Sequence, residues 1–288
     1  MELRNTRYDI DDGVATVWLH RPERANAWTG HLHREYRWIF SQLEADPTVR
    51  VAIVTGTGNH FSVGADSSAL DVGVSRGYYD PGLGEGTANP GYGVRADFDH
   101  DLAWQWALRF PVIAAVNGGC AGVALSLACF CDMRFAYAGA RLSTAAPKLG
   151  LPAEYGLSWV LPRIVGVTAA ADLLMSGRTF AAADAPAGLF NATFDTREAL
   201  LAHVRDYARH IATNTGPSAV AQTKQQLYRD LLCFDVGESI EDSKRRINDA
   251  MATDEYRRGR GRLPGPPPRP TSTPDTRRRP GAERPAPC

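Results

Sequence analysis

The sequence predicts an α/β fold built on parallel, buried strands, and three observations support this class. Two apolar runs without alternation, at residues 50–55 and 111–116, are typical of strands that are buried on both faces. Each run continues into a glycine-containing turn, at residues 56–59 and 117–119. Helical patterns separate the strands. Because such a layout places loops at the carboxyl ends of parallel strands, we expect the ligand-facing loops at that edge of the sheet.

The first elements follow from local patterns. Residues 13–20 alternate and are rich in β-branched side chains, which predicts a strand, and the Arg-Pro that follows ends it. Thr29 is a candidate N-cap for a helix over residues 30–45. After the buried run at 50–55, residues 61–66 form a second strand-to-turn corner, with a short helix expected beyond them.

Residues 71–99 form a long segment without a helical or strand period, rich in Gly, Tyr, Pro and Asp. A loop of this length inside a compact domain is usually functional or disordered. Its aromatic side chains favour a segment that lines a pocket over a disordered insert.

The rest of the chain is mostly helical. Residues 117–119 make the turn before a short helix of small apolar residues, whose free N–H groups suit an anion or oxyanion, although a packed corner is the plainer interpretation. We expect further helices at 101–109, 122–130, 157–165, 168–174, 195–214, 216–232 and 236–257, and strands at 131–137 and 189–194.

This pattern divides the chain into three parts. We expect a core over residues 1–195 and a helical region over 196–257, whose amphipathic helices can pack on a partner subunit. Residues 258–288 are rich in Pro and Arg with almost nothing to bury, which predicts a disordered tail.

Composition excludes several classes of function. Lys plus Arg and Asp plus Glu are 32 each, so no net charge favours nucleic acid or an anionic membrane. No apolar run is long enough to span a bilayer, and the polar first residues do not resemble a signal peptide. The five cysteines lack metal-ligand spacing, so we expect reduced thiols, no metal and a cytoplasmic protein.

Several motifs, in order, resemble the crotonase superfamily, the enoyl-CoA hydratase/isomerase family. The resemblance covers about residues 10–255 and implies a spiral of ββα turns, with C-terminal helices that build trimers or hexamers. It also implies an acyl thioester substrate, with coenzyme A as part of that substrate and no bound cofactor. The motifs are RPERANAW (21–28), VTGTGNHFSVGAD (54–66), PVIAAVNGGCAG (111–122), CDMRFA (131–136), PKLGL (147–151) and LPRIVG (161–166).

The resemblance assigns roles to backbone groups. The N–H groups of Ala65 and Val123 fall where family members hold the thioester oxyanion, and losing one such donor costs about 10²–10³ in rate. Arg24 and Ala25 match positions where the backbone runs past coenzyme A. Asp66 can orient the first turn or cap the helix that follows it.

The sequence departs from the hydratases at three positions. Hydratases of the family use two glutamates for acid–base chemistry, and Ser126 and Ala146 stand at those places here. Ser126 can hold a water molecule or bond back to its own helix. Val123 replaces a usual glycine, and its branched side chain is expected to narrow the site.

Glu154 is the carboxylate that can replace them. It lies eight residues after Ala146, where some superfamily members carry a functional aspartate, as acid–base group in an isomerase and as nucleophile in a dehalogenase. A buried glutamate has a raised pKa that suits proton transfer near neutrality. The alternative is a glutamate that caps the helix beginning near residue 156. Tyr155 can donate a hydrogen bond to substrate or serve in packing.

Three functions therefore remain open. The first is a lyase or isomerase of acyl-CoA with an oxyanion hole and Glu154 as its single acid–base group, catalysing isomerisation, decarboxylation or atypical hydration. The second is hydrolysis of a C–C bond in a β-diketone without coenzyme A. The third is a non-catalytic binding or scaffold protein, which the loss of both glutamates would explain.

Overall fold

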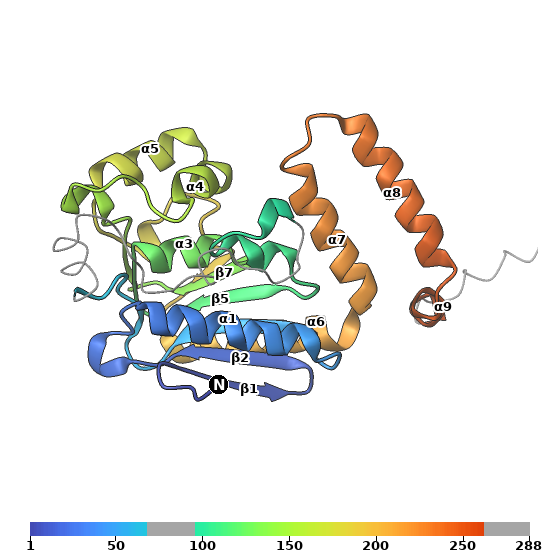
Figure 1. Ribbon diagram of the computed structural model, residues 1–288, viewed down its shortest axis with the longest axis horizontal. Coiled ribbons are helices and arrows are strands. Elements are labelled where there is room, and N and C mark those ends of the chain that lie inside the picture. The colour runs from blue at the N-terminus through green and yellow to red at the C-terminus, as the bar shows by residue number, and fades with distance from the viewer. Residues whose placement is uncertain (68–95, 262–288) are drawn as a thin grey trace, which may run out of the picture.

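The computed structural model describes residues 1–67 and 96–261, and within these residues the strands form two sheets (Figure 1). One sheet has the order β1-β2-β3-β5-β7-β10 and the other the order β4-β6-β8-β9. The strands are β1 (Thr6–Asp11), β2 (Val14–Leu19), β3 (Val51–Gly56), β4 (His60–Ser62), β5 (Val112–Val116), β6 (Gly119–Ala121), β7 (Met133–Tyr137), β8 (Arg141–Ser143), β9 (Phe180–Ala181) and β10 (Ala192–Phe194).

The helices lie around these sheets. No helix among the described residues is long and apolar enough to cross a membrane. The α-helices are α1 (Gly30–Ala45), α3 (Val123–Cys129), α4 (Leu157–Val165), α5 (Val167–Ser176), α6 (Arg197–Asn214), α7 (Pro217–Asp230), α8 (Val236–Met251) and α9 (Asp254–Gly261). Short 3₁₀ helices are η1 (Pro22–Arg24), η2 (Ala96–Phe98), η3 (Ala103–Ala107), η4 (Ala146–Leu149) and η5 (Ala182–Asp184).

The chain winds as a spiral, because each turn supplies one strand to the larger sheet and the next strand to the smaller one. Strands β3, β5 and β7 belong to the larger sheet, and the strands that follow them in the chain, β4, β6 and β8, belong to the smaller sheet. Strands β2, β3, β5, β7 and β10 pair in parallel, as do β4, β6 and β8. The expected α/β spiral of ββα turns is confirmed.

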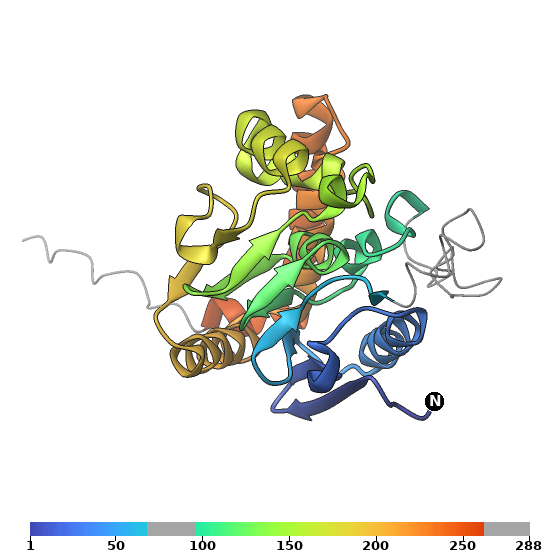
Figure 2. The same ribbon diagram turned by 90° about the vertical axis from the view of Figure 1, so that its left-hand side faces the viewer.

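The central strands are buried on both faces, as the unbroken apolar runs predict. Every residue of β3 and β5 is buried. Ala52 and Val54 pack in the core cluster that includes α1, whereas Val51 and Ile53 pack in the cluster that includes α6. In Figure 2 the blue helix α1 and the gold helix α6 accordingly lie on opposite sides of the strands.

Helix α1 is fixed at its start and to the N-terminal strand. The Thr29 hydroxyl accepts the N–H of Leu32 at 3.1 Å, which confirms the predicted N-cap. Glu35 is fully buried and accepts the Arg4 N–H at 2.8 Å and the Thr6 hydroxyl at 2.7 Å. The carboxylate thereby joins α1 to the beginning of β1.

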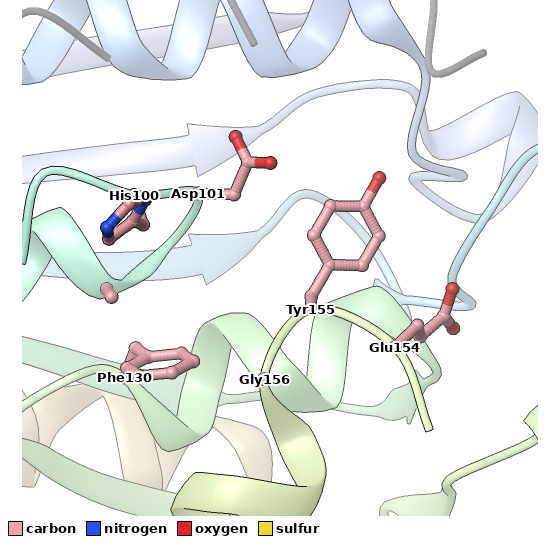
Figure 3. A pocket seen from close by; sticks show the side chains of 7 residues that line it. His100, Asp101, Phe130, Glu154, Tyr155 and Gly156 are labelled. Atoms are coloured by element: carbon pink, nitrogen blue, oxygen red, sulfur yellow. The ribbon is translucent and has the colours of Figure 1, made fainter. Parts of the chain in front are cut away.

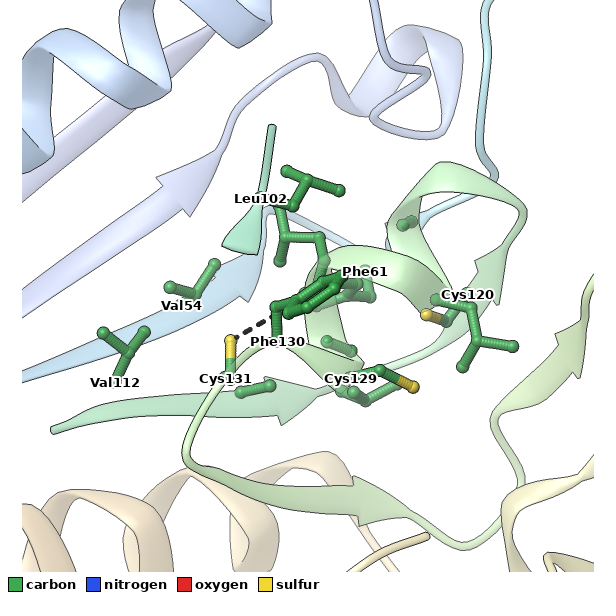
Figure 4. Close-up of a cluster of buried hydrophobic side chains, with 14 of the residues drawn as sticks. Val54, Phe61, Leu102, Val112, Cys120, Cys129, Phe130 and Cys131 are labelled. Carbon is green, nitrogen blue, oxygen red and sulfur yellow. Dashed lines mark hydrogen bonds between the residues drawn. The ribbon is translucent and has the colours of Figure 1, made fainter. Parts of the chain in front are cut away.

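Helix α3 is short and buried on every side, which explains its small apolar residues. Figure 4 shows its surroundings, with Phe61 and Leu102 on one side and three cysteine side chains nearby. Cys120, Cys129 and Cys131 are free and buried, as expected. Burial raises the pKa of the Cys129 thiol to about 11, so this group stays protonated at neutral pH.

A buried lysine fastens α7 to the spiral. The Lys224 ammonium donates to the carbonyl oxygens of Gln105 and Phe110 at 2.7 and 2.8 Å and to the Asp132 carboxylate at 2.8 Å. All three donors of the ammonium are therefore used inside the protein. Beyond α7, helices α8 and α9 stand to one side of the spiral (Figure 1).

Several elements differ from the sequence-based predictions. The helix expected at 101–109 is the shorter 3₁₀ helix η3, which begins after Leu102 at φ 58°. The turn expected at 117–119 includes the start of strand β6, and the helix expected at 236–257 is two helices. Strands β1, β8 and β9 were not predicted. Most of the 71–99 segment and the 262–288 part of the expected tail lie outside the described residues.

We expect Lys224→Met to lower the free energy of unfolding by about 3–5 kcal/mol, because it leaves the largely buried Asp132 carboxylate without its cation. Chemical denaturation at neutral pH measures this loss. The matched control is Lys244→Met, whose ammonium pairs with Glu241 on the surface and should change stability by less than about 0.5 kcal/mol. Equal effects of the two substitutions would contradict an anchoring role for Lys224.

Candidate active site

The first turn follows β4 and presents a free backbone donor. Trp28 donates its N–H to the Gly64 carbonyl oxygen at 2.7 Å, and its own carbonyl oxygen accepts the Asp66 N–H at 2.9 Å. This bridge skips Ala65, because a residue inside a parallel bridge points its N–H away from the partner strand. The Ala65 N–H has no hydrogen-bond partner among the described residues.

The second turn follows β6 and presents another donor. Gly122 donates its N–H to the Ser143 carbonyl oxygen at 3.1 Å, and α3 begins at the next residue, Val123. A first-turn N–H of a helix has no intrahelical partner, and the Val123 N–H has no partner elsewhere in the described part of the chain. The predicted pair of free N–H groups is therefore present.

The two turns touch each other, since β4 and β6 pair in parallel directly before them. A β-carbon at Gly64 would lie 2.8 Å from the Ala121 carbonyl oxygen, and the backbone of Gly64 has φ +95°. Only glycine fits such a conformation and so close an approach. Because Gly64 has no side chain, the segment that carries Ala65 can lie directly against the segment that carries Val123.

Asp66 holds the first turn in place. Its carboxylate is buried and pairs with Arg21 at 3.0 Å and with Arg24 at 3.5 Å. The same Arg21 guanidinium donates to the Ala27 carbonyl oxygen at 2.7 Å. Of the two roles considered for Asp66, these contacts support orientation of the turn. The helix that it was expected to cap begins at Ser67 and continues outside the described residues, so the capping role stays a prediction.

The loop that contains Arg24 and Ala25 serves as a frame for the same turn. Ala25 has φ 49°, donates its N–H to the Pro22 carbonyl oxygen and accepts the Val63 N–H, each at 3.2 Å. Its backbone groups are thus engaged within the protein. The predicted passage of coenzyme A along this loop stays a prediction.

Glu154 lies against the second turn. A β-carbon at Gly122 would lie 2.8 Å from the Glu154 Oε1 atom, so the carboxylate approaches the backbone directly before Val123. Burial raises the pKa of Glu154. The alternative role as a helix cap is wrong, because α4 begins after Gly156 and the Glu154 side chain makes no capping hydrogen bond to it.

Ser126 and Ala146, the two residues that the family resemblance places at hydratase glutamate positions, are buried and are not among the described residues that line the cavity. The Ser126 hydroxyl donates to the Glu154 carbonyl oxygen at 3.4 Å, a long bond, and not to its own helix as one interpretation expected. Ala146 is buried and donates its N–H to the Thr144 carbonyl oxygen. The Val123 side chain packs into the core, and the expected narrowing of the site by this side chain stays a prediction.

A cavity of about 520 Å³ opens beside these elements (Figure 3). Glu154 and Tyr155 stand on its wall, and Tyr155 has φ 49°, which turns the chain sharply before α4. No group of three or more metal-ligating side chains occurs among residues 1–67 and 96–261. The described lining residues are His100, Asp101, Ala103, Phe130, Glu154, Tyr155 and Gly156.

Comparison with known proteins identifies the family. The sequence profile described as enoyl-CoA hydratase/isomerase matches residues 9–262. The chain belongs to this family. A probable enoyl-CoA hydratase of Mycobacterium tuberculosis is 36% identical over 61% of this chain, and the match spans 64% of that relative's length. The 1,2-epoxyphenylacetyl-CoA isomerase of Escherichia coli is 34% identical over 71% of this chain and 74% of its own.

Solved structures of the enoyl-CoA hydratase/isomerase family share the fold. A probable enoyl-CoA hydratase/isomerase from Mycobacterium abscessus is 28% identical, covers 89% of this chain and 94% of its own, and has a TM-score of 0.76. A monofunctional enoyl-CoA isomerase from M. smegmatis is 29% identical, covers 83% of this chain and 99% of its own, and has a TM-score of 0.66.

Sequence reasoning missed part of the cavity wall of this family member. Asp101 and His100 line the cavity from the segment before η3, and Phe130 lines it from the end of α3. The available signal was weak: Asp101 is an acidic residue directly before a segment of apolar and tryptophan side chains. Such a residue is as easily assigned to a helix end as to a pocket.

We expect Gly122→Ala to lower kcat/KM for an accepted thioester by about 10²-fold, because the new methyl group displaces the Glu154 carboxylate. Steady-state kinetics with a thermal unfolding control measure this effect. Gly150→Ala is the matched variant, since Gly150 also has positive φ, at +71°, but a β-carbon there meets no atom within 4 Å. If both variants lost activity in proportion to their stability, backbone strain alone would explain the result.

Proposed function

We propose that this protein is an acyl-CoA isomerase that moves a proton on an enolised thioester, with Glu154 as the acid–base group beside the oxyanion site. The observation that carries this proposal is the position of Glu154 against Gly122, directly before the donor Val123. A base placed there lies next to the carbonyl carbon whose oxygen the donors would hold.

The two free N–H groups support stabilisation of an enolate. Deprotonation of the carbon next to a thioester carbonyl places negative charge on the carbonyl oxygen. Donors that are fixed before the reaction stabilise this charge without reorganisation. Ala65 and Val123 are fixed in this way, the first by the bridge with Trp28 and the second by the start of α3.

The character of Glu154 supports proton transfer more than hydration. Hydration across a double bond uses one group to activate water and another to handle the α-proton, and here Ser126 and Ala146 replace the usual carboxylates. A single carboxylate can take a proton from one carbon and return it to another. Because burial raises the pKa of Glu154, its conjugate acid is better suited to return the proton near neutral pH.

The relatives are consistent with this choice. The E. coli relative is named an isomerase, as is the structural neighbour from M. smegmatis, although other relatives are named hydratases. We infer that coenzyme A enters as part of the substrate and that no separate cofactor takes part. Arg24 and Ala25 are the proposed contacts of its adenine and pantetheine parts, and Tyr155 of its acyl part.

We further propose that the protein assembles through its C-terminal helices as a homotrimer or hexamer. Val236, Ile240, Ile247 and Met251 all lie on one face of α8, and each is about half exposed or more. An apolar stripe of this kind on a helix that stands beside the core favours burial against another copy. Light scattering of the purified chain should give three or six protomers, and a monomer at micromolar concentration would contradict the proposal.

Glu154→Gln should lower the rate of isomerisation by about 10²–10⁴-fold and leave binding of the thioester intact, because the amide keeps the shape of the side chain and cannot accept the proton. Mass spectrometry of a panel of enoyl-, β-keto- and malonyl-type thioesters measures turnover, and exchange in D₂O measures proton removal. Glu198→Gln, an exposed glutamate on α6, is the control and should behave like the unchanged protein.

Two other experimental results would each favour a different function over the proposed isomerase. Absence of coenzyme A binding by calorimetry would favour hydrolysis of a β-diketone C–C bond. Binding without turnover or α-proton exchange of any panel member would favour a non-catalytic binding protein.

A further inference from the structure

The cavity contains a second carboxyl group that the proposed function does not use. Asp101 lines the same wall as Glu154, and its Oδ1 atom is buried without a hydrogen-bond partner among the described residues. The side chain as a whole is nevertheless 33% exposed, so other atoms of it are accessible. In Figure 3 the Tyr155 ring stands between the two carboxyl groups, which come from different segments of the chain.

The groups around Asp101 include histidine and arginine side chains. His33 on α1 is one such group, and its Nε2 atom lies 3.7 Å from the Asp101 Oδ1 atom. Burial, with smaller effects of Arg37 and Arg34, lowers the pKa of His33 to about 4. The ring is therefore neutral at pH 7, and the contact is not an ion pair under those conditions.

Burial also acts on Asp101 itself. It raises the pKa of this carboxyl, and the nearby Arg37 and His100 side chains oppose the shift only in part. His33 is 1% exposed, and neither of its ring nitrogens has a hydrogen-bond partner in the described part of the chain. Unpaired buried polar atoms are costly and concentrate at functional sites. The cavity thus holds two carboxyl groups, on different segments of its wall, and burial raises the pKa of each.

We propose that Asp101 is a second proton-transfer group of this cavity, which acts on a distal carbon of the acyl chain while Glu154 acts beside the thioester carbonyl. This inference rests on the proposed isomerase function. Glu154 lies at the turn that presents the Val123 N–H, so we assign to it the proton on the carbon next to the thioester carbonyl. Asp101 comes from the segment before η3, across Tyr155, where the acyl chain would continue.

The reaction balances for a β,γ-unsaturated thioester. The Glu154 carboxylate accepts the α-proton, and the C–H electron pair spreads over the carbonyl oxygen and the γ-carbon. Protonated Asp101 then gives its proton to the γ-carbon, and the double bond moves to the α,β position. Glu154 ends protonated and Asp101 ionised, and proton exchange with water restores both groups. No oxidant or further reactant is needed.

The test separates the two carboxyl groups with trans-3-hexenoyl-CoA as the probe. Asp101→Asn should lower isomerisation by about 10²–10⁴-fold while α-proton exchange in D₂O continues, because Glu154 is untouched. Glu154→Gln should lose both. Asp99→Asn is the matched control, since Asp99 stands two residues away and is not among the lining side chains. It should retain both activities.

Two further measurements test the role of Asp101 even if the Asp101→Asn variant is unstable. Asp101→Glu retains a carboxyl group and should isomerise faster than Asp101→Asn at matched folded fraction. For the unchanged protein, a probe deuterated at the α-carbon should give product without deuterium at the γ-carbon, because each carbon uses its own group. Deuterium carried to the γ-carbon would overturn the inference and leave Glu154 as the single shuttle.

Failure of the inference differs from failure of the proposed function. If the unchanged protein isomerises the probe and Asp101→Asn does so equally well, only the role of Asp101 is refuted. If the unchanged protein neither isomerises the probe nor exchanges its α-proton, both proposals fall together.

Discussion

The close approach of two backbone turns, at Gly64 and Gly122, is the constraint on which the candidate site depends. Both glycines have positive φ, and a side chain at either would meet an atom 2.8 Å away. The parallel pairing of β4 with β6 brings the turns to this distance. The buried strands, the paired Asp66 carboxylate and the short helix α3 all serve to hold two N–H groups that no acceptor of residues 1–67 and 96–261 reaches.

The same constraint explains where the carboxylates stand. The second turn leaves room for an acidic oxygen beside Gly122, and Glu154 fills it from the loop before α4. Ser126, where the family resemblance predicts a glutamate in a hydratase, donates its hydroxyl to the carbonyl oxygen of that loop. The Ser126 side chain therefore contributes to the structure, and the carboxyl groups of the cavity come from other segments of its wall.

The sequence predicted the parts of the structure that have a local cause. The buried strands, the Thr29 cap and the glycine turns could be assigned because their residues carry the reason for the conformation. Strands β8 and β9 could not, because elements of two or three residues owe their conformation to their neighbours. Asp101 was missed for a similar reason, since its place on the cavity wall depends on how η3 packs against α3 and α4.

The buried lysine of α7 bears on the order in which the chain folds. Its three contacts join residues that are 92, 114 and 119 positions apart in the sequence. Closing such long loops costs entropy before any contact compensates for it, and the cost grows with the logarithm of loop length. The carbonyl oxygens that receive Lys224 take their places only when β5 and the segment before it are formed. We therefore expect α7 to dock late, onto a spiral that is already folded.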